Sequence, residues 1–228
     1  MRFLTTTLGL LIAVSQFTFG QAEEKKTTPS IRIVCVASLP DTEDFVIASQ
    51  DEKSEWHEYG SIKLRSSSIS EWLPAAAGTL HLAVRASGGT LTSKCQFTYP
   101  EGGRRVVVIL LPDSTKKVYH ADVVDTAKLA FGKGHTLLVN YSSQPATVML
   151  GAQKTIVKPG GRSVVKPLAE PNGMFRMLIA YTKESGEFVP CFDRYVPADN
   201  DSREFLLLLP DPTVGLRVFS LPEFGPFE

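Results

Sequence analysis

Apolar and polar positions alternate along much of this chain, and the period of the alternation is two. The segments 31–35, 80–84 and 175–181 each place an apolar residue at every second position. This period is typical of a β-strand that buries one face. Clusters of Gly, Pro, Asn and Asp recur between such segments. Together the two patterns predict an all-β protein of antiparallel sandwiches, and no segment carries a convincing helical period.

The pattern occurs twice. RRVVVILLPD (104–113) returns as REFLLLLPD (203–211), with the two prolines 98 positions apart. VCVASLP (34–40) matches VNYSSQP (139–145), GTLHLAV (78–84) matches GMFRMLI (173–179), and Cys95 falls on Cys191. A repeat of this period indicates a duplicated domain rather than a solenoid. We therefore predict two tandem β-sandwich domains at 30–122 and 134–222, a linker at 123–133 and a tail at 223–228.

Two matching segments are apolar on both faces, 106–111 and 205–209. A sandwich strand normally turns one face to water, so a strand buried on both sides needs a third layer. One interpretation is that these strands cover each other across a domain interface, with Val107 and Leu206 among the outward positions. The alternative is that a loop or the linker covers each strand.

The first twenty residues combine Arg2 with an apolar stretch from Phe3 to Phe19, a pattern typical of a secretory signal peptide. Residues 21–30 then form a polar linker. An uncleaved anchor is the alternative. No other segment is long enough to span a membrane, so we expect a secreted or periplasmic protein without a stable span after cleavage.

Export bears on the three cysteines, Cys35, Cys95 and Cys191. An oxidising compartment allows one disulfide and one leftover thiol, in any of three pairings. The alternative is that all three are small buried side chains.

Composition excludes some classes of function. The chain has 228 residues, is 43% hydrophobic, and balances 24 Lys and Arg against 24 Asp and Glu. A neutral chain gives no electrostatic reason to expect nucleic acid. The four histidines lack zinc-ligand spacing, and neither a nucleophile elbow nor a phosphate loop occurs. The sequence predicts no cofactor, no metal centre and no enzymatic activity.

Two groups of residues are candidates for binding. Trp56, His57 and Tyr59 lie in an acidic insertion of the first copy, where exposed rings would stack on a sugar or anchor a partner. The alternative is that a ring folds back onto the sandwich. Asp199, Asp201 and Glu204 form a weaker calcium candidate, because hard cations need several converging oxygens. Its alternative is a hairpin turn.

The second copy, LLVNYSSQPATVMLG followed by VKPGGRSVVKP, resembles exported bacterial proteins of unknown function built from tandem Ig-like domains. The resemblance covers most of 135–220 and, less completely, 31–121, where the Pro-Gly-Gly turn is missing. It implies Ig-like sandwiches and an envelope location, and it brings no catalytic residues.

The function expected from these observations is a non-enzymatic binding or scaffolding module of the cell envelope, with an envelope protein or a glycan as its partner. One alternative is a carbohydrate-binding module that uses the Trp56–Tyr59 loop. A second alternative is a hydrolase whose site lies between the domains.

Overall fold

The structure is a computed structural model that describes residues 28–39, 44–86, 88–183, 185–225 and 227. Those residues are all-β, with 17 strands and no helix. They therefore contain no helix of the length and apolarity that a membrane crossing requires. The predicted signal peptide at 1–20 lies outside the described residues, as does most of the linker at 21–30.

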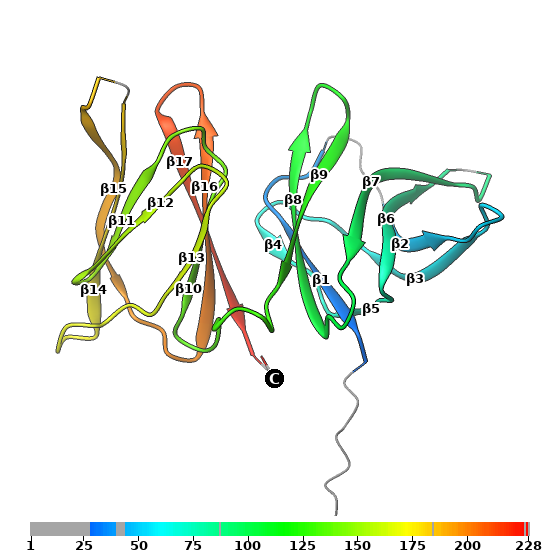
Figure 1. Cartoon of the computed structure of the whole chain (residues 1–228), viewed down its shortest axis with the longest axis horizontal. Coiled ribbons are helices and arrows are strands. Elements are labelled where there is room, and N and C mark those ends of the chain that lie inside the picture. The colour runs from blue at the N-terminus through cyan, green and yellow to red at the C-terminus, as the bar shows by residue number, and fades with distance from the viewer. Residues whose placement is uncertain (1–27, 40–43, 87, 184, 226, 228) are drawn as a thin grey trace, which may run out of the picture.

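The strands form four sheets, which face each other in pairs as two β-sandwiches side by side (Figure 1). In the first sandwich, one sheet has the order β4-β1-β8-β9, with β5 also beside β1: β1 (Ser30–Cys35), β4 (Ser68–Ile69), β5 (Leu73–Pro74), β8 (Arg105–Asp113) and β9 (Val118–Asp125). The facing sheet has the order β3-β2-β6-β7: β2 (Phe45–Gln50), β3 (Trp56–Ile62), β6 (Gly78–Arg85) and β7 (Leu91–Tyr99).

The second sandwich repeats this plan, without an equivalent of β5 among its described residues. One sheet has the order β13-β10-β16-β17: β10 (Thr136–Asn140), β13 (Arg162–Val165), β16 (Ser202–Asp211) and β17 (Gly215–Phe224). The facing sheet has the order β12-β11-β14-β15: β11 (Ala146–Leu150), β12 (Gln153–Val157), β14 (Met174–Thr182) and β15 (Phe188–Pro197). The all-β sandwich prediction is confirmed.

The pairing differs from the expectation at one place in each sandwich. β1 runs parallel to β8, and β10 runs parallel to β16, while the other pairs are antiparallel. A parallel pair cannot be closed by a hairpin. Here the chain crosses to the facing sheet between the two strands, so the opening strand of each copy lies beside the first strand of its last hairpin.

The boundaries of the two copies also shift. β9 continues to Asp125, beyond the expected end of the first copy at 122. β17 continues to Phe224, so 223–224 belong to a strand and not to a tail.

Pairing partners fix which residues of the two copies are equivalent. The parallel pair Ile31–Val106 in the first sandwich corresponds to Thr136–Glu204 in the second. The offsets are 105 in the opening strand and 98 in the last hairpin, as the sequence alignment has them. Positions in these strands can therefore be compared directly.

One part of the alignment needs correction. β7 has a β-bulge opposite Leu82 and Ala83 of β6, and β15 has one opposite Ile179 and Ala180 of β14. Aligning the two bulges matches β6 with β14 at an offset of 97 and not 95. Cys95 pairs with Leu82 and faces the core, whereas Phe192 pairs with Ile179 and Cys191 lies in the bulge. Cys95 and Cys191 are therefore not equivalent.

All three cysteines are free thiols. Burial raises the pKa of Cys35 and of Cys95 to about 11, and it also raises the pKa of Cys191. Cys35 and Cys95 are buried, as the buried-thiol interpretation expects, whereas Cys191 is half-buried, and none of the three disulfide pairings is present.

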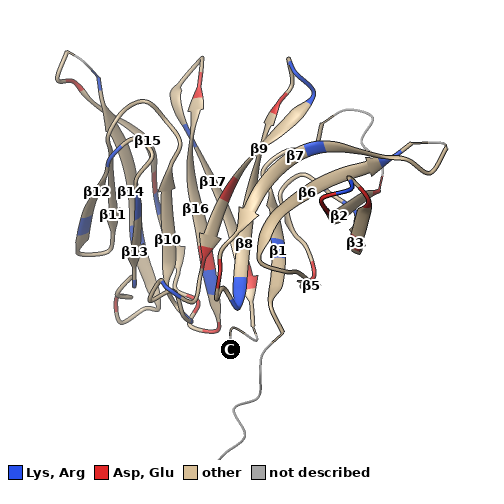
Figure 2. Ribbon diagram, turned by 45° about the vertical axis from the view of Figure 1, so that its right-hand side comes forward, with Lys and Arg blue, Asp and Glu red and all other residues tan. Residues whose placement is uncertain are grey.

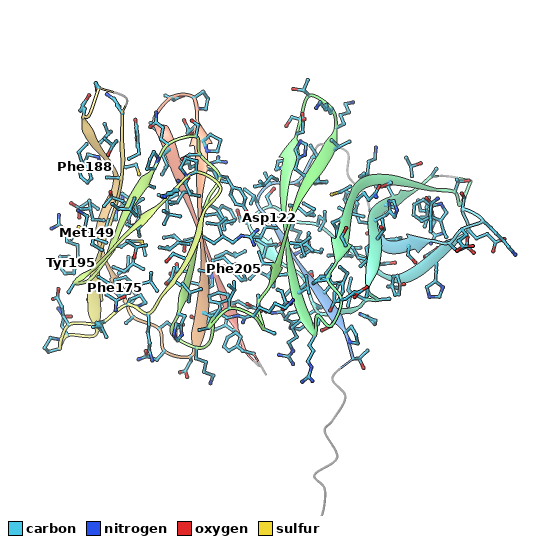
Figure 3. The ribbon with its side chains drawn as sticks, in the orientation of Figure 1. Asp122, Met149, Phe175, Phe188, Tyr195 and Phe205 are labelled. Atoms are coloured by element: carbon cyan, nitrogen blue, oxygen red, sulfur yellow. The ribbon has the colours of Figure 1, made fainter. Side chains whose placement is uncertain are left out.

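Each sandwich has its own core between its sheets, and a third core lies between the two sandwiches. The third core is formed by the outward faces of the sheets that contain β8 and β16: Val34, Val36, Val107, Ile109, Val124, Phe131, Leu137, Val139, Phe205, Leu207 and Leu209. Figure 3 shows Phe205 in this middle layer. The two-sided apolar segments therefore do cover each other, and Phe131 of the connecting segment adds to the cover.

The outward positions were only partly predicted. Val107 lies in the third core, but Leu206 faces the core of the second sandwich. Because side chains alternate in a strand, Phe205 and Leu207 are the outward residues. The expectation for Leu206 is wrong by one position.

Ion pairs join the sandwiches at two edges of the third core. Asp122 of β9 accepts a hydrogen bond from the Tyr141 hydroxyl at 2.6 Å and pairs with Arg162. At the other edge, Glu223 binds Arg32 of the first sandwich and Arg203 of the second, each at 2.6 Å. Elsewhere Lys and Arg are interspersed with Asp and Glu over the strands (Figure 2).

Candidate functional site

Trp56 is part of strand β3 and not of an exposed loop. Its ring packs on the outer face of the sheet, against a small apolar cluster, and meets the His81 ring edge-on at 5.2 Å. Burial lowers the pKa of His81, which favours the neutral imidazole. Trp56 is therefore half-buried against its own sheet.

His57 and Tyr59 are separated from Trp56. Their two rings meet edge-on at 5.1 Å, and Tyr59 packs against the core of the first sandwich with its hydroxyl 3.2 Å from Ser49 Oγ. Tyr59 thus lies toward the core and Trp56 on the opposite face of the sheet. The three side chains do not form one stacking surface, and the interpretation that a ring folds back onto the sandwich describes Trp56 and Tyr59 better.

The three carboxylates of the calcium candidate have separate partners. Asp199 accepts hydrogen bonds from the backbone amides of Asp201 and Ser202, at 2.8 and 3.3 Å, and the first of these lowers its pKa. Asp201 lies 4.0 Å from Lys133. Glu204 turns into the second sandwich. No three His, Cys, Asp or Glu side chains in the described part of the chain form a group that could hold a metal ion.

A pocket of about 370 Å³ lies between the sheets of the second sandwich. It opens where the edge strands β15 and β17 touch over only a short stretch; the equivalent strands β7 and β9 of the first sandwich touch over a longer one. Apolar side chains from both sheets form its walls: Phe175, Met177, Phe192, Val196, Leu206, Val218 and Phe224. Its size is at the lower end of the range of about 300–1,000 Å³ that small-molecule sites occupy.

One end of the pocket is polar. Thr136 Oγ1 donates a hydrogen bond to Glu204 Oε2 at 3.5 Å, and the Ser220 hydroxyl donates to Oε1. Thr136 is buried, Glu204 is half-buried and Ser220 is exposed at the mouth. Two hydroxyls therefore hold a carboxylate at the border between the apolar walls and water.

The same positions are apolar in the first sandwich. Thr136 and Glu204 correspond to Ile31 and Val106, which are fully buried in the core there. A hydroxyl and a carboxylate thus replace two branched alkyl groups at facing positions of one parallel pair. A polar group at a core position costs free energy unless it is hydrogen-bonded, and here the two bond each other.

The last hairpin shows the same divergence. Ser220 pairs with Leu206, as Val123 pairs with Val108 in the first sandwich. Ser220 therefore stands where Val123 packs against the first core.

The facing sheet shows a further difference, which leaves room for the pocket. In the first sandwich Tyr99 is 1% exposed, and its hydroxyl lies 3.2 Å from the Ser30 carbonyl oxygen and 3.1 Å from that of Gly103. At the offset of 97 set by the bulges, its counterpart is Val196, a wall of the pocket. The shorter side chain does not reach across to close the end of the sandwich.

Sequence reasoning selected Glu204, but for a cation site, and it missed Thr136, Ser220 and Val196. The signal was present in the opening strand, since the alignment sets Ile31 against Thr136. A position that is apolar in one copy and polar in the other indicates that apolar side chains no longer fill that part of the core in the second copy.

A scan of the chain against protein-family models finds no match, and a search of curated proteins finds none either.

Proposed function

We propose that this chain is an exported, non-enzymatic binding module of the cell envelope, and that its second sandwich holds a small apolar molecule between its sheets. The export half of the proposal rests on the apolar stretch from Phe3 to Phe19 behind Arg2. The binding half rests on the pocket. The Ig-like assignment comes from the resemblance of the second copy and belongs to the proposal.

One observation carries the binding half: the first sandwich is closed and the second is open at equivalent positions. Ile31, Val106 and Tyr99 fill the first core, while Thr136, Glu204 and Val196 leave a pocket with apolar walls in the second. An unfilled apolar pocket loses packing contacts, so the second sandwich gives up stability that a ligand would restore.

Methionine methyl groups report on the pocket directly. Met177 is a wall of the pocket, whereas Met149 lies on the outer face of the same sheet (Figure 3). We expect 2-phenylethanol, a small molecule with an apolar ring, to shift the methyl resonance of Met177 in a saturable manner in protein labelled with ¹³C at the methionine methyls. The Met149 resonance is the internal control and should not move.

Equal shifts at both methyls would indicate non-specific association. An unmoved Met177 resonance at millimolar probe would reject the pocket as a binding site.

A further inference from the structure

We infer that the ligand of the second sandwich is an amphipathic cation: a compact apolar body that carries an ammonium group paired with Glu204. This inference rests on the proposed function and adds the chemical class of the ligand. It follows from the charges at the pocket, from the orientation of its one lining arginine and from the position of the free carboxylate oxygens.

The charges that face the pocket are negative. Its charged lining residues are Glu204, Asp199 and Arg203. Arg203 is 3% exposed and is directed to the opposite face of its sheet, where its guanidinium bonds Glu223 at 2.6 Å and the Phe131 carbonyl oxygen at 2.9 Å. Its guanidinium is therefore bound on the far face of the sheet and makes no ion pair with the carboxylates of the lining.

Glu204 itself has no ion-pair partner among the described residues. Its two oxygens accept hydrogen bonds from the hydroxyls of Ser220 and Thr136, and its backbone amide donates to the His135 carbonyl at 2.9 Å. Arg194, which pairs with Met177 in the facing sheet, stacks at 5.9 Å over the Phe192 ring and does not line the pocket. A carboxylate has about four acceptor sites, so two hydroxyls leave capacity for a charged donor.

The apolar walls determine the chemistry of the part of the ligand that does not contact Glu204. A hydrated metal ion would leave Met177, Leu206 and Val218 without contacts, and an uncharged hydrocarbon would leave the Glu204 carboxylate without a partner of opposite charge. A molecule with an apolar body and a terminal ammonium satisfies both ends. An ammonium donating to a carboxylate forms a charge-assisted hydrogen bond, about twice as strong as a neutral one.

Three probes on one skeleton test this assignment: 2-phenylethylammonium, 2-phenylethanol and 3-phenylpropanoate, each titrated against the Met177 methyl resonance at neutral pH and physiological ionic strength. We expect the ammonium to bind about tenfold more tightly than the alcohol, because its hydrogen bond to Glu204 is charge-assisted. The carboxylate probe should bind most weakly. In Glu204→Gln the ammonium and the alcohol should bind alike, while the alcohol still shifts Met177.

The control variant is Glu187→Gln, which removes an exposed carboxylate that pairs with Lys183 at the opposite end of β15. It should keep the full preference for the ammonium. Equal affinities for ammonium and alcohol in the parent protein, or a preference that survives Glu204→Gln, would overturn the inference and leave the proposed function standing. A Met177 resonance that no probe moves would overturn both.

Discussion

Replacing Glu223 with alanine should lower the free energy of unfolding by about 3–5 kcal/mol, the cost of leaving buried charges without their partner. Glu223 is 2% exposed and binds Arg203 and Arg32, which are 3% and 13% exposed. Without the carboxylate, two guanidinium groups remain at the junction of the sandwiches with no negative charge between them. Urea unfolding followed by circular dichroism measures the loss.

The matched control is Glu187→Ala, which breaks an exposed ion pair with Lys183. Exposed pairs contribute little, so we expect a change within about 0.5 kcal/mol. If Glu223→Ala cost no more than this control, the three charged groups would be reaching water, and the buried junction described above would not exist in solution.

Truncating Phe205 to alanine should cost about 3–5 kcal/mol, as large-to-small changes of buried aromatic residues do. Phe205 is fully buried in the third core and meets the Phe131 ring edge-on at 5.1 Å. The truncation opens a cavity between the sandwiches, where both contribute walls. Its effect is measured as the shift of the urea midpoint at an unchanged m-value.

Tyr195→Ala is the control for this variant, because Tyr195 is an aromatic residue of the second sandwich that is 57% exposed on an outer face (Figure 3). Its loss should cost less than about 1 kcal/mol. Equal losses from the two variants would mean that the sandwiches do not share a core.

The third core could be predicted from the sequence because it rests on a local pattern. Apolar residues on both faces of 106–111 and 205–209 require a further layer, whatever the details of the fold. The prediction that Leu206 faces outward is wrong because it does not use the alignment of the two copies. The outward residue Val107 corresponds to Phe205, one position before Leu206.

The ion pairs at the junction were not predictable in this way. Arg32 and Glu223 are 191 positions apart, and nothing local distinguishes them from other charged residues. Glu223 falls in the predicted tail at 223–228. Pairing with β16 extends β17 to Phe224, so tertiary contacts and not local preference fix the end of the strand.

The pocket could be predicted from the sequence only in part. Aligning the two copies by their turns and apolar residues gives an offset of 95 between β6 and β14, whereas aligning them by their bulges gives 97. A bulge adds an unpaired residue, and the alternation of apolar and polar residues in the sequence does not reveal it. The comparison of Tyr99 with Val196 therefore needed the structure, although the change from Ile31 to Thr136 was visible in the sequence.

We propose that the second sandwich binds a ligand because its core has diverged from that of the first. The most direct test restores residues of the first copy with the double substitution Glu204→Val and Val196→Tyr, and repeats the titration of the Met177 methyl resonance with 2-phenylethylammonium. We predict that the saturable shift disappears, because the tyrosine fills the pocket and the carboxylate is gone, while the urea midpoint does not fall. A folded variant that binds the probe as tightly as the parent would contradict this proposal.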